Sequence, residues 1–286
     1  MKKNSVHITN LLWRLHNIDV SRFDVSFLTR SFNKRMTETH CNSVEEYYSL
    51  LEQNKNEAED FLHSLNISYS EFFRNSLTFS VLERIILPAL IQKKKDTRHK
   101  EIRIWSAACA SGQESYSLAM LLEELINSDS EKINYRIFAT DQCESQVNDA
   151  WKGQYSADSL NNLNLKRVKQ WFTKHGDIYT VKQELKKNID FSVFDLLNEK
   201  LSSPPSSIFC DFDLVLCANL LFYYKPEFRK IILGKSTNSL ANGGYLITGE
   251  TERDILVRHN YHEVFPHSAI FQKGNKQKKM KIKKSQ

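Results

Sequence analysis

The sequence predicts an α/β protein whose core is a mostly parallel, Rossmann-like sheet, preceded by a helical domain and interrupted by a small antiparallel β insertion. Two observations support this prediction. From position 102 onward, short apolar runs alternate with helical patterns, as parallel sheets with crossover helices require. Residues 1–76, in contrast, show helical patterns and little sign of a strand. A chain of 286 residues, of which 41% are hydrophobic, can fill such a core.

The amino-terminal region, residues 1–76, is expected to form a small bundle of amphipathic helices. Ser43 and Glu46 form an S-x-x-E capping signature at the start of one helix. Four apolar residues then fall on one face of that helix, namely Val44, Tyr47, Tyr48 and Leu51. Another helical pattern runs over 79–88. The lysine-rich stretch 93–100 after it is expected to be a solvated connection and not a binding patch.

The second domain is expected over residues 77–272. Its candidate strands are 102–105, 135–139, 212–217 and 244–248. Between the first two, Leu118, Leu122 and Leu125 mark a helix face, so this part is a βαβ unit. From about 155 to 194, short alternating pieces next to a His-Gly-Asp turn signal break the rhythm and predict the antiparallel insertion.

The positive charge of the chain is concentrated at its carboxyl end. Residues 273–286 contain seven lysines and no acid, so the net charge of +6 leaves about −1 for the rest. We expect a solvated, disordered tail there. The alternative is an electrostatic arm toward anionic lipid, nucleic acid or an acidic partner.

Composition also bears on the compartment. The five cysteines show no C-x-x-C pair and no metal-like spacing with histidine, so we interpret them as reduced thiols and expect no metal. The longest apolar stretch, 214–224, is about half of the roughly 20 residues that a membrane helix needs. The first residues lack the apolar core of a secretory signal. A cytoplasmic location is therefore expected.

The most informative stretch is 102–120, IRIWSAACASGQESYSLAM, where a strand runs into small residues and then into a helix. Residues 106–112 leave the backbone bare enough for a ligand to lie against it. Only one of them is glycine, and no Lys-Ser/Thr pair follows, so both the dinucleotide fingerprint and the phosphate-binding P-loop are absent. A ligand with a pyrophosphate is therefore disfavoured.

An acidic residue, Asp141, ends the second predicted strand. A carboxylate at the carboxyl edge of a parallel sheet can accept hydrogen bonds from both ribose hydroxyls of a nucleoside. The alternative is that Asp141 caps the following helix. Taken with the small-residue stretch, it predicts an adenosine ligand without a phosphate chain.

Several runs of this sequence resemble, in order and spacing, those of a known family. They are FFRN (72–75), IWSAACASGQESYSLAM (104–120), ATD (139–141), FDLVLCANLLFYY (212–224) and GGYLITGETE (243–252). The family is the CheR-type chemotaxis receptor (protein-glutamate O-) methyltransferases, and the resemblance spans about 68–271. It implies a class I methyltransferase sheet that binds S-adenosyl-L-methionine and leaves S-adenosyl-L-homocysteine as product.

The resemblance also implies an activity and partners. Members transfer the methyl group to glutamate side-chain carboxylates of methyl-accepting chemotaxis receptors, acting on their cytoplasmic domains in sensory adaptation and signal transduction. Neither nucleic acid nor a metal is expected as a partner, and contact with the membrane is expected only through the receptor. In some members the antiparallel insertion docks on the receptor.

Site residues are carried over where motif positions match. The implied cofactor-binding residues are Ser68, Ser70, Arg74, Glu114, Asp141, Asp195, Leu196, Asn219 and Leu220. Tyr223 corresponds to the tyrosine that the family places near the transferred methyl, and we expect it to orient the acceptor. A glutamate acceptor is already ionised at pH 7, so no general base is needed.

This chain departs from the family pattern at several of these positions. Ser68 and Ser70 replace Asn and Thr, Asp195 replaces Asn, and Ala218 replaces Arg. The departures leave open a non-catalytic receptor adaptor that binds the cofactor. A nucleic-acid methyltransferase is the other alternative, but the sequence after the fourth strand is Asn219-Leu-Leu-Phe and not the N/D-P-P-Y/F of amino-methylating DNA enzymes.

For three positions a purely structural role is the alternative. Arg74 could form a domain-bridging ion pair, and Glu114 could favour the first turn of its helix. The aromatic side chains on either side of Tyr223 are expected to pack in the core.

Overall fold

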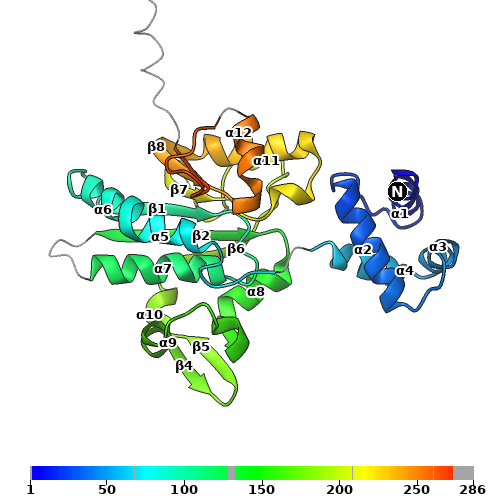
Figure 1. The fold of residues 1–286 in the computed structure, drawn as a ribbon, viewed down its shortest axis with the longest axis horizontal. Helices are drawn as coiled ribbons and strands as arrows, with labels where there is room; N and C mark the ends of the chain where they lie inside the picture. The colour runs from blue at the N-terminus through cyan, green and yellow to red at the C-terminus, as the bar shows by residue number, and fades with distance from the viewer. Residues whose placement is uncertain (1, 67–68, 128–132, 208, 260, 273–286) are drawn as a thin grey trace, which may run out of the picture. The chain divides into compact units, whose positions relative to one another are not determined.

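The computed structural model describes residues 2–66, 69–127, 133–207, 209–259 and 261–272, with the side chains of the first helix described from residue 6 (Figure 1). The chain forms two compact units. The first comprises residues 1–67 and 220–231, and the second comprises 68–219 and 232–286. The sequence predicts a boundary near 76, whereas the compact units divide after 67. The predicted basic tail, 273–286, and Ser68 lie outside the described residues.

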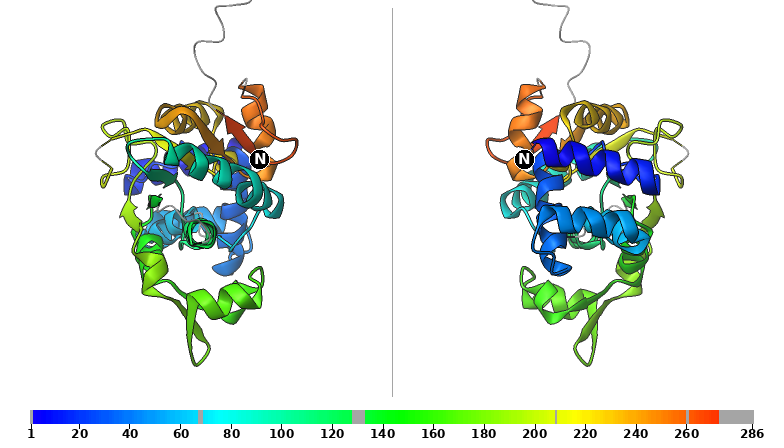
Figure 2. Two further views of the ribbon diagram at one scale, coloured as in Figure 1. Left: turned by 90° about the vertical axis from the view of Figure 1, so that its left-hand side faces the viewer. Right: turned by 90° about the vertical axis from the view of Figure 1, so that its right-hand side faces the viewer.

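The first unit is helical, as predicted (Figures 1 and 2). Its helices are α1 (Lys2–His16), α2 (Val25–Glu38), α3 (Val44–Gln53) and α4 (Lys55–Ser64), to which the chain later adds η3 (Leu221–Tyr223) and the beginning of α11 (Pro226–Asn238). The predicted cap is confirmed: Ser43 Oγ accepts from Glu46 N at 3.1 Å, and Glu46 Oε2 accepts from Asn42 N at 2.7 Å. The predicted face of α3 buries Tyr47 and Leu51 completely.

The second unit is built on a six-stranded sheet with the strand order β6-β2-β1-β7-β8-β9. The strands are β1 (Glu101–Ser106), β2 (Asn134–Asp141), β6 (Ile189–Val193), β7 (Phe212–Leu216), β8 (Leu240–Ile247) and β9 (Ile270–Gln272). All pairs are parallel except β8 with β9. The four predicted strands are confirmed. β6 and β9 were not predicted as strands of this sheet, because β6 lies inside the segment assigned to the insertion and β9 is short.

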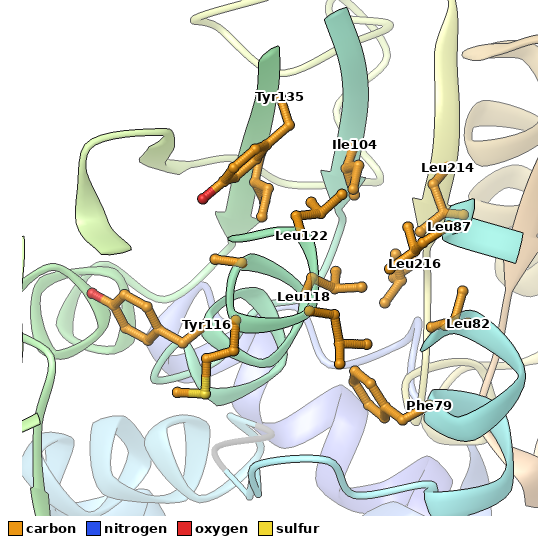
Figure 3. Packing of buried hydrophobic residues seen from close by; sticks show 14 of the residues in the cluster. Phe79, Leu82, Leu87, Ile104, Tyr116, Leu118, Leu122, Tyr135, Leu214 and Leu216 are labelled. Atoms are coloured by element: carbon orange, nitrogen blue, oxygen red, sulfur yellow. The ribbon is translucent and has the colours of Figure 1, made fainter. Parts of the chain in front are cut away.

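Helices cover the sheet and bury its apolar side chains. They are α5 (Ser76–Val81), the π-helix η1 (Leu82–Ile86), α6 (Leu87–Lys95), α7 (Gln113–Ile126), α8 (Glu144–Lys152), η4 (Glu250–Glu252) and α12 (Arg253–Arg258). Leu118 and Leu122 of α7 pack with Ile104 of β1 in the core, which confirms the predicted βαβ unit (Figure 3). The predicted helical pattern over 79–88 is also confirmed. It continues to Lys95, so the expectation of a solvated connection from residue 93 is wrong at its start: Lys94 Nζ lies 2.7 Å from Oδ2 of the buried Asp213.

The insertion is a separate three-stranded antiparallel sheet, β3-β5-β4, which confirms the predicted type of structure. Its elements are β3 (Gln154–Ser156), η2 (Ala157–Leu160), α9 (Leu165–Trp171), β4 (Phe172–His175), β5 (Ile178–Val181) and α10 (Gln183–Lys186). The hairpin of β4 and β5, drawn in yellow-green, turns at Gly176 with a φ of 59° (Figures 1 and 2). The predicted turn is therefore present.

Two features are absent from the part of the chain that the structure describes. No helix in it is both long and apolar enough to cross a bilayer. In the same residues, no three His, Cys, Asp or Glu side chains gather as a metal site would require.

Candidate functional site

Most of the predicted site residues of the second unit lie at or just after the carboxyl ends of its parallel strands, whereas Ser70 and Arg74 come before β1. Ser106, at the end of β1, is paired with Ala139 of β2 and Leu216 of β7, and Asp141 is paired with Val193 of β6. The parallel register therefore brings the segments after β1, β2, β6 and β7 to one edge of the sheet. This edge is where α/β proteins bind ligands.

The small-residue loop after β1 is fixed by backbone hydrogen bonds to both neighbouring strands. Ala107 N donates to Leu216 O at 2.8 Å, and Cys109 N donates to Thr140 O at 2.9 Å. Ala110 has a φ of 44°, which is a strained conformation for a residue with a Cβ. The backbone of this loop is thus held in one place. Its side chains are small, and Ala107, Cys109 and Ala110 are each at most 5% exposed.

Asp141 is bonded to this loop. Its Oδ2 accepts from Ala110 N at 3.0 Å, and its Oδ1 accepts from Cys143 N at 2.9 Å. The side chain is 8% exposed, and this burial raises the pKa of Asp141 although the backbone N–H groups act in the opposite direction. A carboxylate offers about four acceptor positions, so these bonds leave room for the hydroxyls of a ribose. Asp141 is therefore more than a cap of the next helix, because it joins two strand ends.

Glu114 lies in the first turn of α7, immediately after the loop. Its Oε1 accepts from Ser106 Oγ at 2.7 Å. The pKa of Glu114 is raised to about 7, mainly by burial and to a smaller extent by the charge of Glu252, while the Ser106 bond and the charge of Arg74 act in the opposite direction. Arg74 and Glu114 therefore act on each other across the site, although they come from different segments.

The segment that carries Arg74 also holds Ser70, which is half-buried. Arg74 Nη1 donates to Tyr69 O at 3.2 Å, and its guanidinium lies 4.9 Å from the centre of the Tyr69 ring. These contacts are local. The choice between a cofactor contact and an ion pair for this arginine stays a prediction.

After β6, Asp195 and Leu196 lie beside the same edge. Phe194 N donates to Asp141 O at 2.9 Å, which ties this segment to the end of β2. Asp195 Oδ1 accepts from Leu197 N at 2.8 Å, and Leu196 is buried. Where the family has Asn, this chain therefore has a carboxylate, Asp195, which already accepts a hydrogen bond from the local backbone.

Asn219 follows β7 and has a φ of 59°. Its backbone N donates to Glu252 Oε2 at 2.8 Å. The same oxygen accepts from Thr248 Oγ1 at 2.8 Å and from Gly249 N at 3.0 Å, and the Glu252 side chain is fully buried. Glu252 therefore holds the ends of β7 and β8 together beneath Asn219. No role is predicted for Glu252 from the sequence, although it lies in the run GETE of the resemblance. The spacing of Glu252 after Thr248 and Gly249, which is that of a capping residue, is the feature that could have indicated its role.

The two remaining predicted residues, Leu220 and Tyr223, belong to the first unit. Leu220 is buried, Tyr223 O accepts from Asp24 N at 2.8 Å, and the Tyr223 ring lies edge-on to Phe27 with 4.7 Å between ring centres. The expected packing is seen for Tyr224, which is buried and stacks on Phe23. The roles of Leu220 and Tyr223 toward a ligand stay predictions.

A hollow lies at the edge of the sheet opposite the candidate site, at the amino ends of β1 and β2. It has a volume of about 610 Å³ and is lined mostly by polar and basic side chains, among them Lys94, Arg98 and Arg103. Two of these cations already have protein partners: Lys94 contacts Asp213, and Arg103 Nη2 donates to Ser207 Oγ at 2.7 Å. Because this hollow lies at the amino ends of the strands, it is separate from the candidate site, which lies at their carboxyl ends.

Comparison with known proteins places both units. Residues 7–65 match the family model described as "CheR methyltransferase, all-alpha domain", and residues 68–268 match "CheR methyltransferase, SAM binding domain". A chemotaxis protein methyltransferase of Listeria innocua is 29% identical over 88% of this chain and 91% of its own length. One of Borreliella burgdorferi is 32% identical over 72% of each chain. Chemotaxis protein methyltransferase 1 of Pseudomonas aeruginosa is 34% identical over 63% of this chain and 64% of its own length.

Proposed function

The chain belongs to the CheR methyltransferase family, and on this premise we propose that it methylates glutamate side-chain carboxylates on the cytoplasmic domains of chemotaxis receptors. It is an S-adenosylmethionine-dependent methyltransferase of chemotaxis. Beyond this activity, we propose the acceptor group, the receptor as partner, a cytoplasmic location, and the residues that bind the cofactor and orient the acceptor.

One observation carries the proposed site: the buried carboxylate of Asp141 is hydrogen-bonded to the backbone of the small-residue loop at Ala110. A nucleoside can lie against such a loop while its ribose hydroxyls donate to the acid. The loop has neither the glycine-rich nor the lysine-containing motif of a phosphate-binding loop. These residues therefore fit an adenosine without phosphates, which is the nucleoside part of S-adenosylmethionine.

The charges around the site fit the rest of the cofactor. Glu114 would complement the positive sulfonium and amino groups, and Arg74 would bind the carboxylate of the methionine part through its planar fork. Asp195 and Leu196 would lie near the adenine, and Asn219 and Leu220 would keep the cofactor-edge position. Ser70, with Ser68 beside it in the sequence, would add polar contacts to the methionine end.

The main contribution of the protein to the reaction would be to place the cofactor and the acceptor carboxylate relative to each other. The bound cofactor supplies a methyl group that is already activated by its sulfonium. A glutamate acceptor with an ordinary pKa near 4.3 is ionised at neutral pH, so no residue of this chain has to remove a proton. Holding the reactants in line can contribute roughly 7 to 11 kcal/mol. Tyr223 would orient the acceptor and shape the space for the methyl, and it would not act as a base.

The cofactor site is tested with Asp141→Ala. We expect this variant to lose measurable binding of S-adenosylhomocysteine in isothermal titration calorimetry, because the ribose loses its acceptor. Near-normal affinity with intact folding would refute the proposed site.

The activity is tested by transfer of radiolabelled methyl groups to membranes that carry chemotaxis receptors. We expect the label to be released as methanol by mild base, as carboxyl methyl esters are. Cofactor binding without transfer would instead indicate a receptor adaptor, and base-stable label in nucleic acid would indicate a nucleic-acid methyltransferase.

A further inference from the structure

The segment 69–75, called the Arg74 segment below, is packed against the antiparallel insertion. Phe72 is fully buried, and its ring is edge-on to two insertion rings, with 5.0 Å to the centre of Tyr155 and 5.6 Å to that of Phe172. Asn162 Nδ2 also donates to Glu71 Oε2 at 3.4 Å. The insertion is therefore a direct support for a segment that the proposed function places at the cofactor.

Phe73, the residue before Arg74, has an unusual backbone. Its φ is 51°, a region that a bulky side chain rarely occupies and that costs of order 1 to 3 kcal/mol. Its backbone N donates to Ser117 Oγ at 3.0 Å, on the same helix as Glu114 and one turn further along. A conformation of this cost persists only where the surroundings hold it, and it sets the direction in which Arg74 leaves the backbone.

The Phe73 ring is held by Arg167 of α9, in the insertion. The guanidinium carbon of Arg167 lies 4.4 Å from the centre of the ring. The same group binds Glu124 of α7 through Nε at 3.0 Å and Nη2 at 2.8 Å, and Glu83 of the π-helix through Nη2 at 2.7 Å. Its side chain is only 14% exposed. A largely desolvated cation that is fixed by two carboxylates can hold an aromatic ring firmly.

We propose that Arg167 is a positioning residue for the cofactor, which acts by holding Phe73 and thereby fixing the direction in which Arg74 leaves the backbone. The inference rests on the proposed function, in which Arg74 binds the cofactor. Arg167 itself need not touch the ligand. The insertion thereby contributes to cofactor affinity in addition to any contact it makes with a receptor.

A double-mutant cycle tests this route. We expect Arg167→Met to raise the dissociation constant for S-adenosylhomocysteine about tenfold by calorimetry, and Arg74→Met to raise it at least as much. If Arg167 acts through Arg74, the double variant binds no more weakly than Arg74→Met alone. A purely structural Arg167 would give additive losses, and additivity would overturn the inference.

The same cycle separates this inference from the proposed function. An unchanged affinity in Arg167→Met, with a loss in Arg74→Met, overturns the positioning role and leaves the cofactor site intact. An unchanged affinity in Arg74→Met contradicts the assignment of Arg74 itself.

Arg136→Met is the matched control. Its guanidinium also pairs with a carboxylate, that of Asp190, and lies 5.3 Å from the centre of a phenyl ring, that of Phe138, but far in sequence from the Arg74 segment. We expect its dissociation constant to stay within about twofold of the wild type. An equal loss in this control would show a general effect of removing an arginine and overturn the inference.

If circular dichroism shows that Arg167→Met does not fold, Phe73→Leu replaces it in the cycle. Leucine keeps most of the apolar bulk and removes the ring face that Arg167 holds. The expected result is the same rise in the dissociation constant, again not additive with Arg74→Met. A wild-type dissociation constant in Phe73→Leu would overturn the inference.

Discussion

At the scale of single residues, the site contains a carboxyl group that is poised near neutrality. The pKa of Glu114 is raised to about 7, mainly by burial and to a smaller extent by the charge of the buried Glu252. The Ser106 bond and the charge of Arg74 act in the opposite direction. A binding site for a cation gains from such a group only when it is ionised, so the protonation of Glu114 and cofactor binding must be linked.

We expect the affinity for S-adenosylmethionine to rise with pH up to about 7 and then to level off, because protonated Glu114 does not attract the sulfonium. Calorimetry from about pH 5 to about pH 9 measures this profile. In Glu114→Gln the rise should vanish and binding should be weak, with any residual pH dependence reporting the cofactor's own groups. A wild-type profile in this variant would contradict the role of Glu114.

Glu114→Gln, which should weaken cofactor binding, should increase the stability of the cofactor-free protein. Glu114 has a pKa of about 7 in the folded protein against 4.5 ordinarily, so its favourable contribution is complete below pH 4.5 and is lost as the pH rises through 7. Without cofactor, Glu114→Gln should therefore stabilise the protein at about pH 8, by roughly 2 kcal/mol. Urea denaturation measures this, and a destabilised variant would contradict the raised pKa.

At the scale of elements, the turn from β1 into α7 depends on one glycine. Gly112 precedes α7 with a φ of 93°, and a Cβ built there would lie 2.9 Å from the Cβ of Ala150 in α8. Both the backbone conformation and the space therefore require glycine. This close approach packs α8 against the start of α7 and so fixes the position of the first turn of α7, which contains Glu114.

Gly112→Ala should destabilise the protein more than Gly176→Ala does. Both residues have a positive φ, but a Cβ at Gly176 would have nothing within 4 Å. The Gly176 variant should lose about 1 kcal/mol for the backbone conformation, and the Gly112 variant about 1 to 3 kcal/mol more for the overpacking. The midpoints of urea denaturation compare the two. Equal losses would show that α8 yields to the added methyl.

At the scale of the whole molecule, the chain leaves the second unit after Asn219 and contributes residues 220–231 to the first. There Tyr224 forms an isolated bridge with Phe23, and Arg229 Nη2 lies 3.6 Å from Asp24 Oδ2. The proposed acceptor-orienting residue, Tyr223, is thus built into the helical unit, whereas Glu114, Asp141 and Arg74 are built into the other.

Tyr223→Phe should therefore leave cofactor affinity within about twofold of the wild type and lower the turnover by about tenfold or less. The ring that packs on Phe27 is kept, and only the hydroxyl is lost. Calorimetry and methyl transfer measure the two effects separately. A loss of cofactor binding as large as that of Asp141→Ala would contradict a role confined to the acceptor.

The sequence by itself determined the local features of this protein. The cap at Ser43, the small-residue loop at 106–112 and the acid at Asp141 each follow from patterns within about ten residues, because caps and turns are short-range. The βαβ unit follows from a succession of such short patterns along the chain. The order of the motifs identified the family. Only the tertiary structure decided that β6 belongs to the main sheet and that Lys94 pairs with Asp213.

The same holds for the two supports of the site. Glu252 meets Asn219 across 33 positions, and Arg167 meets Glu83 across 84. A strand's alternation does not say which sheet it joins, and a charged side chain does not say which distant partner it will meet. Those choices depend on how the elements pack. This is why the proposed ligand-binding residues could be inferred from the sequence, whereas the residues that hold them in place could not.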